Sequence, residues 1–147
     1  MLFRSVDDET PGVTFGKGWR ERHNANGGQV GDVCHMPPGG HSWGVNFKPV
    51  AAVGDAVYPL PVKEAGRYTL MGRVPYLHSA TMDSKTAMEI CSGGKVTAFT
   101  VNQSVGTGTW QRIGEFDLAP GATLTILPAK SYGTVIADGF ALVPMER

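Results

Sequence analysis

The sequence predicts a single all-β domain built as an antiparallel two-sheet β-sandwich. From residue 56 onward, short runs of residues alternate between apolar and polar with a period close to two, and Gly, Pro or Asn turns separate the runs. The chain also contains 20 Gly and 10 Pro among its 147 residues, a proportion typical of short strands joined by many turns. Helical periodicity is nowhere sustained, and this length suits one domain with one core.

The first well-defined strands lie in the middle of the chain. In residues 66–74, Tyr68, Leu70 and Val74 fall on one face and polar residues fall on the other, which predicts a strand with one buried face. Residues 86–91 and 96–101 are rich in β-forming side chains, and the four residues Ser92-Gly93-Gly94-Lys95 between them suit a tight turn. A β-hairpin is therefore predicted over 86–101.

Three further strands are predicted toward the C-terminus, over residues 110–118, 122–127 and 134–143. In the first, Ile113 shares a face with Phe116 and Leu118 only if Gly114 forms a β-bulge, so a bulge is predicted there. Residues 16–55 give no comparable pattern: they are rich in glycine and contain three of the four histidines. This segment is interpreted either as functional loops or as irregular cover for one sheet.

Charge and hydropathy exclude two classes of partner. Lys plus Arg equals Asp plus Glu at 13 each, so the chain has no basic excess for binding nucleic acid or an anionic membrane. No apolar run approaches the roughly 20 residues that span a bilayer, and no secretory signal is present in the sequence. The two cysteines, Cys34 and Cys91, permit either one disulfide or two separate thiols.

Six short motifs occur in order along the chain: Val6-Asp7-Asp8, Gly18-Trp19, Val62-Lys63-Glu64-Ala65-Gly66-Arg67-Tyr68, Thr100-Val101-Asn102-Gln103, Trp110 followed by Ile113-Gly114, and Val135-Ile136-Ala137-Asp138-Gly139-Phe140. Together they resemble the golvesin C-terminal domain family, also described as a xanthan-lyase carbohydrate-binding-like domain. The resemblance covers residues 6 to 144, so we expect residues 1–5 to be a non-native or linker start and 6–147 to be the domain.

The resemblance implies a jelly-roll-like sandwich attached to secreted bacterial proteins, among them polysaccharide-degrading enzymes and FAD-dependent proteins. We therefore expect a secreted or surface-located, non-catalytic accessory module. Its expected partners are a polysaccharide or cell-surface glycan and an upstream catalytic domain of the same chain. The chain departs from the family pattern in the loop from Tyr76 to Ser84 and in the region from His23 to Val53, so ligand contacts in those parts do not transfer.

Asp138 is the most informative single residue, because a period of two places it on the same face as Ile136, Phe140 and Leu142. A buried carboxylate must accept hydrogen bonds, pair with a cation or bind a metal. The first and last strands of jelly rolls commonly lie side by side, which would bring Asp7 and Asp8 to Asp138. Two interpretations follow, hydrogen bonding within the fold or a structural calcium site, and no other cofactor is expected.

Exposed aromatic rings are the expected glycan contacts, since sugar rings stack on flat apolar faces. Trp19 and Trp110 sit where strands begin and are expected to pack in the core. Trp43 and Tyr76 are expected in loops and are the preferred ligand contacts, and His78 and Tyr132 are further candidates.

Two other functions stay open on the sequence. One is a structural domain that packs against its parent enzyme through a broad apolar patch and binds no sugar. The other is a small hydrolase using His78 or His41, although no Gly-x-Ser-x-Gly elbow is present. Cys34-His35 with His41 or His23 matches no zinc spacing, so no zinc site is predicted.

Overall fold

The structure is a computed structural model of the 147-residue chain. For the strands at 20–23, 34–35, 41–45 and 76–77 it describes the backbone alone. The residues described are 4–6, 10–16, 20–23, 34–35, 41–45, 54–74, 76–77, 83–106, 108–128 and 135–145.

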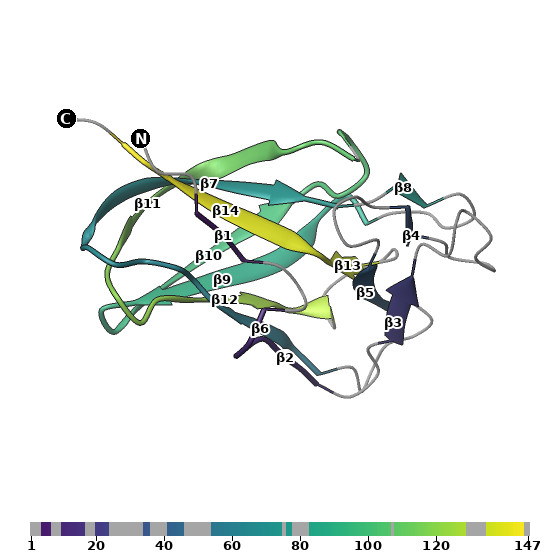
Figure 1. Cartoon of the computed structure of the whole chain (residues 1–147), viewed down its shortest axis with the longest axis horizontal. Coiled ribbons are helices and arrows are strands. Elements are labelled where there is room, and N and C mark those ends of the chain that lie inside the picture. Colours follow the sequence, from purple (N-terminus) through teal and green to yellow (C-terminus); the bar gives the residue numbers. More distant parts are fainter. Residues whose placement is uncertain are drawn as a thin grey trace.

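Two antiparallel sheets pack face to face, which confirms the predicted sandwich (Figure 1). The four-stranded sheet has the order β1 (Arg4–Val6), β14 (Gly139–Pro144), β7 (Gly66–Arg73) and β11 (Gln111–Leu118). The five-stranded sheet has the order β10 (Lys95–Val101), β9 (Thr86–Ser92), β12 (Thr123–Ile126), β6 (Ala56–Pro59) and β2 (Thr14–Phe15).

Residues that alternate between apolar and polar in the sequence also alternate between buried and exposed in the structure. Along most of β6, β7, β9 and β12 every second residue is buried and its neighbours are partly or fully exposed, as the pleat of a strand requires. The inward-facing side chains of both sheets form one core, in which the Tyr58 and Phe140 rings meet edge to face with centroids 4.8 Å apart. Tyr58 comes from β6 and Phe140 from β14, so this ring pair joins the two sheets.

The predicted hairpin and bulge are both confirmed. Ser92 pairs with Lys95 across Gly93 and Gly94, whose φ angles of +58° and +80° suit glycine and give a tight two-residue turn. On β11 the pairing with β7 shifts between Arg112 and Gly114, which leaves Ile113 as the extra residue of the bulge.

Two smaller sheets lie at one end of the sandwich (Figure 1). One contains β13 (Val135–Ala137), β5 (His41–Val45) and β3 (Arg20–His23), and the other contains β4 (Cys34–His35) and β8 (Tyr76–Leu77). We call this end the loop end, and the opposite end, with the Gly93-Gly94 turn, the hairpin end. The expectation that Trp43 and Tyr76 lie in loops is wrong, because Trp43 is on β5 and Tyr76 is on β8.

The predicted strand over 134–143 is two strands. β13 pairs with β5 and β14 pairs with β1 and β7, so the chain changes sheet at Asp138. The apolar run is continuous through this point because both faces are buried from Val135 to Leu142, and a fully buried run does not reveal a change of partner. The expected pairing of the first and last strands is found, with Val6 opposite Phe140.

The described residues contain no α-helix, and accordingly no helix that could span a membrane. Cys91 lies on β9 as a free, exposed thiol, and Cys34 lies on β4 at the loop end.

Candidate functional site

Polar side chains are buried at one place in the described part of the chain, and that place is the loop end. The four buried polar or charged residues there are Asp83, Thr86, Gln103 and Asp138. Thr86 Oγ1 donates to Asp83 Oδ2 at 2.8 Å, and the Gln103 backbone N–H donates to the Asp83 carbonyl at 3.0 Å. These groups remain buried because they are bonded to one another or to backbone, as burial of polar groups requires.

Gln103 connects this cluster to the strand change at Asp138. Its Nε2 donates to the Ile136 carbonyl at 2.8 Å, and the Ile136 N–H donates to Gln103 Oε1 at 2.9 Å. The side-chain amide thus takes the place of a neighbouring strand for one residue of β13. The two bonds fix the position of the chain just before Asp138.

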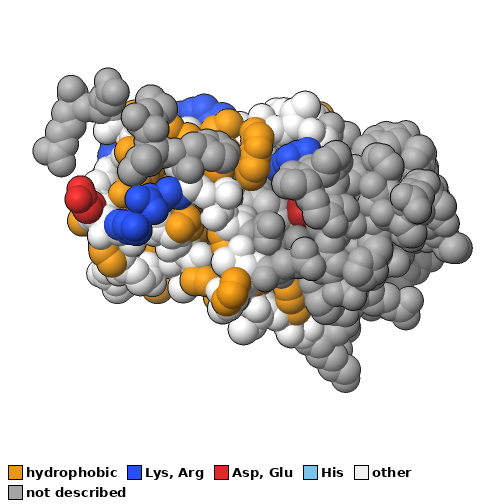
Figure 2. Space-filling view, in the orientation of Figure 1, with side chains coloured by type: hydrophobic (Ala, Val, Ile, Leu, Met, Phe, Trp, Pro, Cys, Tyr) orange, Lys and Arg blue, Asp and Glu red, His pale blue; other side chains and the backbone are white. Residues whose placement is uncertain are grey.

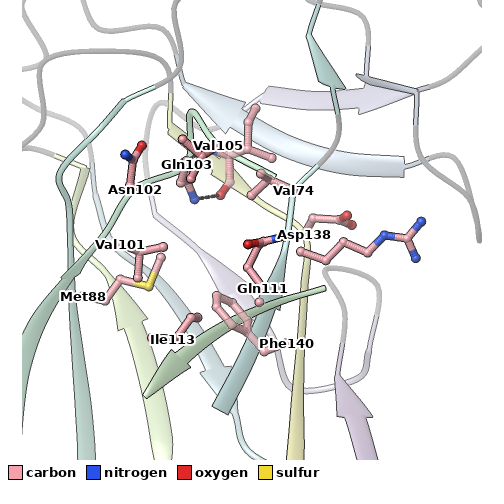
Figure 3. A pocket seen from close by; sticks show the side chains of 13 residues that line it. Val74, Met88, Val101, Asn102, Gln103, Val105, Gln111, Ile113, Asp138 and Phe140 are labelled. Carbon is pink, nitrogen blue, oxygen red and sulfur yellow. Dashed lines mark hydrogen bonds between the residues drawn. The ribbon is translucent and has the colours of Figure 1, made fainter. Parts of the chain in front are cut away.

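A small pocket of about 30 Å³ opens beside these residues (Figure 3). In Figure 3, Asp138 and Gln111 lie on one side, Asn102 and Gln103 on the other, and Phe140 with other apolar side chains forms the floor. The described residues that line it are Gly72, Arg73, Val74, Met88, Val101, Asn102, Gln103, Val105, Gln111, Ile113, Ile136, Asp138 and Phe140.

The loop after β10 forms one wall of the pocket and is held by its own hydrogen bonds. Asn102 Oδ1 accepts from the N–H of Ser104 at 2.9 Å, an Asx turn that starts the loop. Gln111 Nε2 donates to Thr109 Oγ1 at 2.7 Å and lies against Gly106, where an added Cβ would stand 2.2 Å from that nitrogen. Gly106 has a φ of +62°, a backbone conformation that favours glycine.

Arg73 supplies the cationic group of the lining. Its Nε is buried and has no hydrogen-bond partner in the part of the chain that the structure describes. The guanidinium lies 5.9 Å from the centroid of the Trp110 ring, within range of a cation–π contact. The Trp110 ring also lies against Gly139, where an added Cβ would meet it at 3.3 Å. Trp110 is therefore half-buried beside the pocket, and the expectation that it packs in the core is wrong.

Asp138 is buried, as the sequence predicts, with 6% of its surface exposed. Its backbone carbonyl accepts from the Tyr58 hydroxyl at 2.9 Å, which ties the strand change to the five-stranded sheet. Its side chain lines the pocket, so a carboxylate and a guanidinium border the same small space.

The other predicted site residues are placed only in part. Trp43 pairs through its backbone with Ala137, next to Asp138, and Tyr76 pairs with His35. Asp7, Asp8, His78 and Tyr132 lie outside the described residues, so the calcium site stays a prediction. Within the described residues, no group of three or more His, Cys, Asp or Glu side chains is arranged to hold a metal ion.

Sequence reasoning did not select Arg73, Gln103 or Gln111. Arg73 falls on the polar face of its strand, and Gln103 and Gln111 are common surface residue types. The Asn102-Gln103-Ser104 turn is the one local signal near them, and it does not indicate that Gln103 bonds Ile136, 33 positions away.

The pocket offers binding chemistry. The carboxylate and amide oxygens accept hydrogen bonds, and the guanidinium and amide nitrogens donate them. Among the described residues that line it, none is Ser, Cys, His or Lys and one, Asp138, carries a carboxylate, whereas glycoside hydrolysis ordinarily uses two carboxylates.

Comparison with known structures finds a similar fold in a xanthan lyase, a carbohydrate-binding module and a mannanase. The chain is similar to part of a Paenibacillus xanthan lyase (TM-score 0.77, 18% identity, 98% of this chain and 13% of that chain). It is also similar to the family 35 carbohydrate binding module from Clostridium thermocellum (TM-score 0.59, 14% identity, 95% of this chain and 98% of that chain). A third similar structure is the Podospora anserina GH26-CBM35 β-(1,4)-mannanase (TM-score 0.59, 15% identity, 99% of this chain and 28% of that chain).

These similarities concern the fold, and the chain spans 13% of the length of the xanthan lyase. No match was found among curated protein sequences. The model of the Golvesin C-terminal domain family matches residues 6–144, nearly the whole chain. The chain belongs to the Golvesin C-terminal domain family.

Proposed function

We propose that the chain is a non-catalytic accessory module that binds a polysaccharide or cell-surface glycan through the loop-end pocket. The observation that carries this proposal is the pocket itself, where Arg73 and Asp138 border one small space that is otherwise lined mainly by apolar side chains, beside the half-buried ring of Trp110. Carbohydrate recognition combines these elements, since sugar hydroxyls both donate and accept hydrogen bonds and sugar rings present apolar faces to aromatic rings.

The size of the pocket limits what enters it. A volume of about 30 Å³ holds roughly two water-sized groups, so a hydroxyl or hydroxymethyl group fits and a whole sugar ring does not. The sugar ring would then lie outside, against an aromatic side chain at the rim. Trp110 is one such ring, and Trp43 stays a candidate because its strand pairs with the residue before Asp138.

As in modules that concentrate an enzyme on its substrate, such binding raises the local concentration of an attached catalytic domain on the polymer. We infer that the parent protein is a secreted bacterial enzyme, either polysaccharide-active or FAD-dependent. The similar xanthan lyase and mannanase chains support this inference, because each contains a domain of this fold as a small part of a longer protein.

The main rival is a domain that packs against its parent enzyme and binds no sugar. That function favours a broad apolar patch. On the face shown in Figure 2, the described apolar side chains are dispersed among polar ones. The large hydrophobic residues that are most exposed, Val96, Val105 and Met145, lie on β10, in the loop after it and beyond the end of β14. The described residues on this face therefore do not form the broad apolar patch that the rival function favours.

Calorimetric titration of xanthan oligosaccharides into the chain and its variants tests the proposal. Arg73→Ala removes the guanidinium that borders the pocket and should weaken binding about tenfold. Trp43→Ala and Tyr76→Ala should also weaken it while leaving the melting curve nearly unchanged. Arg112→Ala is the matched control, because its guanidinium bonds Glu115 on the exposed surface and does not line the pocket. Equal affinity in Arg73→Ala and Arg112→Ala would place the binding site elsewhere.

A further inference from the structure

We infer a second carbohydrate-binding site, for a neutral oligosaccharide segment, in a groove at the hairpin end. The groove consists of two adjoining hollows of about 210 and 660 Å³, which share Arg67, Ser92, Lys95 and Asp117. The larger hollow lies within the range of small-molecule sites, roughly 300–1,000 Å³. The inference rests on the carbohydrate-binding function proposed above and adds a site at the opposite end of the sandwich.

The groove lies between the edge strands β10 and β11 and the ends of their neighbours β7 and β9. The Phe99 and Phe116 rings, 5.1 Å apart, close the space between β10 and β11. The groove lining combines small or polar residues, among them Ser92, Thr97 and Gly66, with the apolar side chains Ile90, Phe116, Leu118 and Met145. The Gly93-Gly94 turn leaves the rim open, since a Cβ added at either glycine would meet no atom within 4 Å.

Charged side chains of both signs line the groove. Arg67 and Lys95 lie in the lining with Glu115 and Asp117, and Arg112, outside the lining, also pairs with Glu115 at 2.7 Å. Arg67 pairs with Asp117 at 3.2 Å and with Glu115 at 3.7 Å, and its side chain is 49% exposed. Exposed pairs of this kind contribute little stability, so they can exchange partners with a ligand. A lining with charges of both signs favours an uncharged ligand that offers both donors and acceptors.

Free hydrogen-bonding groups point to hydroxyl partners. The Lys95 ammonium makes no ion pair or hydrogen bond with any residue that the structure describes. Ser92 Oγ accepts from the Ala119 N–H at 2.9 Å, which fixes its position and leaves its hydroxyl hydrogen to donate. The half-buried Phe116 ring adds an apolar surface for the C–H face of a sugar. Donors, acceptors and an apolar surface together are what an oligosaccharide requires.

Nuclear magnetic resonance titration of the full chain detects binding at the hairpin end and at the loop end separately, because each end has its own amide signals. The probes are three neutral hexasaccharides: cellohexaose, mannohexaose and laminarihexaose. At least one should shift the backbone amides of Ser92, Gly94, Thr97 and Asp117. The side-chain amides of Gln103 and Gln111 report the loop-end pocket in the same spectra.

The double variant Lys95→Ala with Thr97→Val removes one ammonium and one hydroxyl and should raise the dissociation constant at the groove about tenfold. Lys63→Ala is the control, an exposed lysine outside both linings that should leave the constant unchanged. Overlapping urea curves for the variants and the parent chain exclude unfolding as the cause.

Each outcome separates the two sites. Shifts at the groove that weaken in the double variant support the second site, whether or not the loop-end amides also move. Shifts confined to Gln103 and Gln111 overturn the second site and leave the proposed function intact. An absence of shifts at both ends with all three hexasaccharides overturns the second site and weighs against the proposed function as well.

Discussion

Gln103 binds Ile136 as a neighbouring strand would, with its side-chain amide donating to the Ile136 carbonyl and accepting from the Ile136 N–H. Both residues are buried, and Gln103 is 2% exposed. The pair holds the loop after β10 against the chain just before Asp138. The geometry of the loop-end pocket therefore depends on one amide group.

Replacing Gln103 with Ala should destabilise the fold by about 2 kcal/mol, because a buried backbone donor and acceptor would lose their partners. Urea unfolding measures this. Gln111→Ala is the control, since its amide is exposed and, among the described residues, bonds the nearby Thr109 and Gly106. Equal midpoints for Gln103→Ala and the parent chain would show that the two bonds do not hold the loop.

Asp138→Ala should lower the free energy of unfolding by roughly 1 to 3 kcal/mol, because groups bonded to the buried carboxylate would lose their acceptor. Asp117→Ala should change it by less than about 0.5 kcal/mol, because that side chain is 83% exposed. Thermal denaturation of the two variants compares a buried and an exposed aspartate directly. A smaller loss of stability for Asp138→Ala than for Asp117→Ala would show that the buried Asp138 carboxylate does not stabilise the fold.

Gly16→Ala should destabilise the domain by about 1 to 3 kcal/mol, because the new Cβ would stand 2.7 Å from the backbone of Gly54, which cannot move aside as a side chain can. The matched substitution Gly66→Ala meets nothing closer than 3.9 Å and should be neutral within about 0.5 kcal/mol. Chemical denaturation of both variants tests the close approach, and a neutral Gly16→Ala would show that these segments lie farther apart.

The predicted calcium site of Asp7, Asp8 and Asp138 makes stability depend on the metal. A chelator should lower the melting temperature of the parent chain, because calcium bound to the folded state alone stabilises it. The chelator should have no effect on Asp138→Asn, which replaces the charged ligand with a neutral amide. A melting temperature of the parent chain that is the same with and without chelator would retire the site and leave hydrogen bonding as the reason for the buried carboxylate.

Most strands of the sandwich were predictable because residues close together in the sequence determine them. Residues 66–74 and 86–101 alternate with a period of two, and Gly93-Gly94 favours a tight turn. These elements can therefore be predicted without knowing which distant residues they contact. The bulge beside Gly114 was predictable for the same reason, since the break in alternation is visible in the sequence.

What the sequence could not predict depends on partners far along the chain. The division of 134–143 at Asp138 follows from β5 lying beside one half and β1 and β7 beside the other. Trp43 was expected in a loop because it lies in the glycine-rich segment 16–55, which shows no clear strand pattern, and its pairing with Ala137 spans 94 positions. The pocket combines residues from 72–74, 88, 101–113 and 136–140, which only the fold brings together.

Affinity electrophoresis of the purified chain tests the central claim, that this is a glycan-binding module without catalytic activity of its own. Gels containing xanthan, cellulose derivatives, pectin or peptidoglycan fragments would be run beside gels without polymer. We expect retarded migration in at least one polymer, reduced by Arg73→Ala and unchanged by Arg112→Ala, with no product released from that polymer. Unchanged migration of the parent chain in all four, or release of product from any of them, would contradict the account.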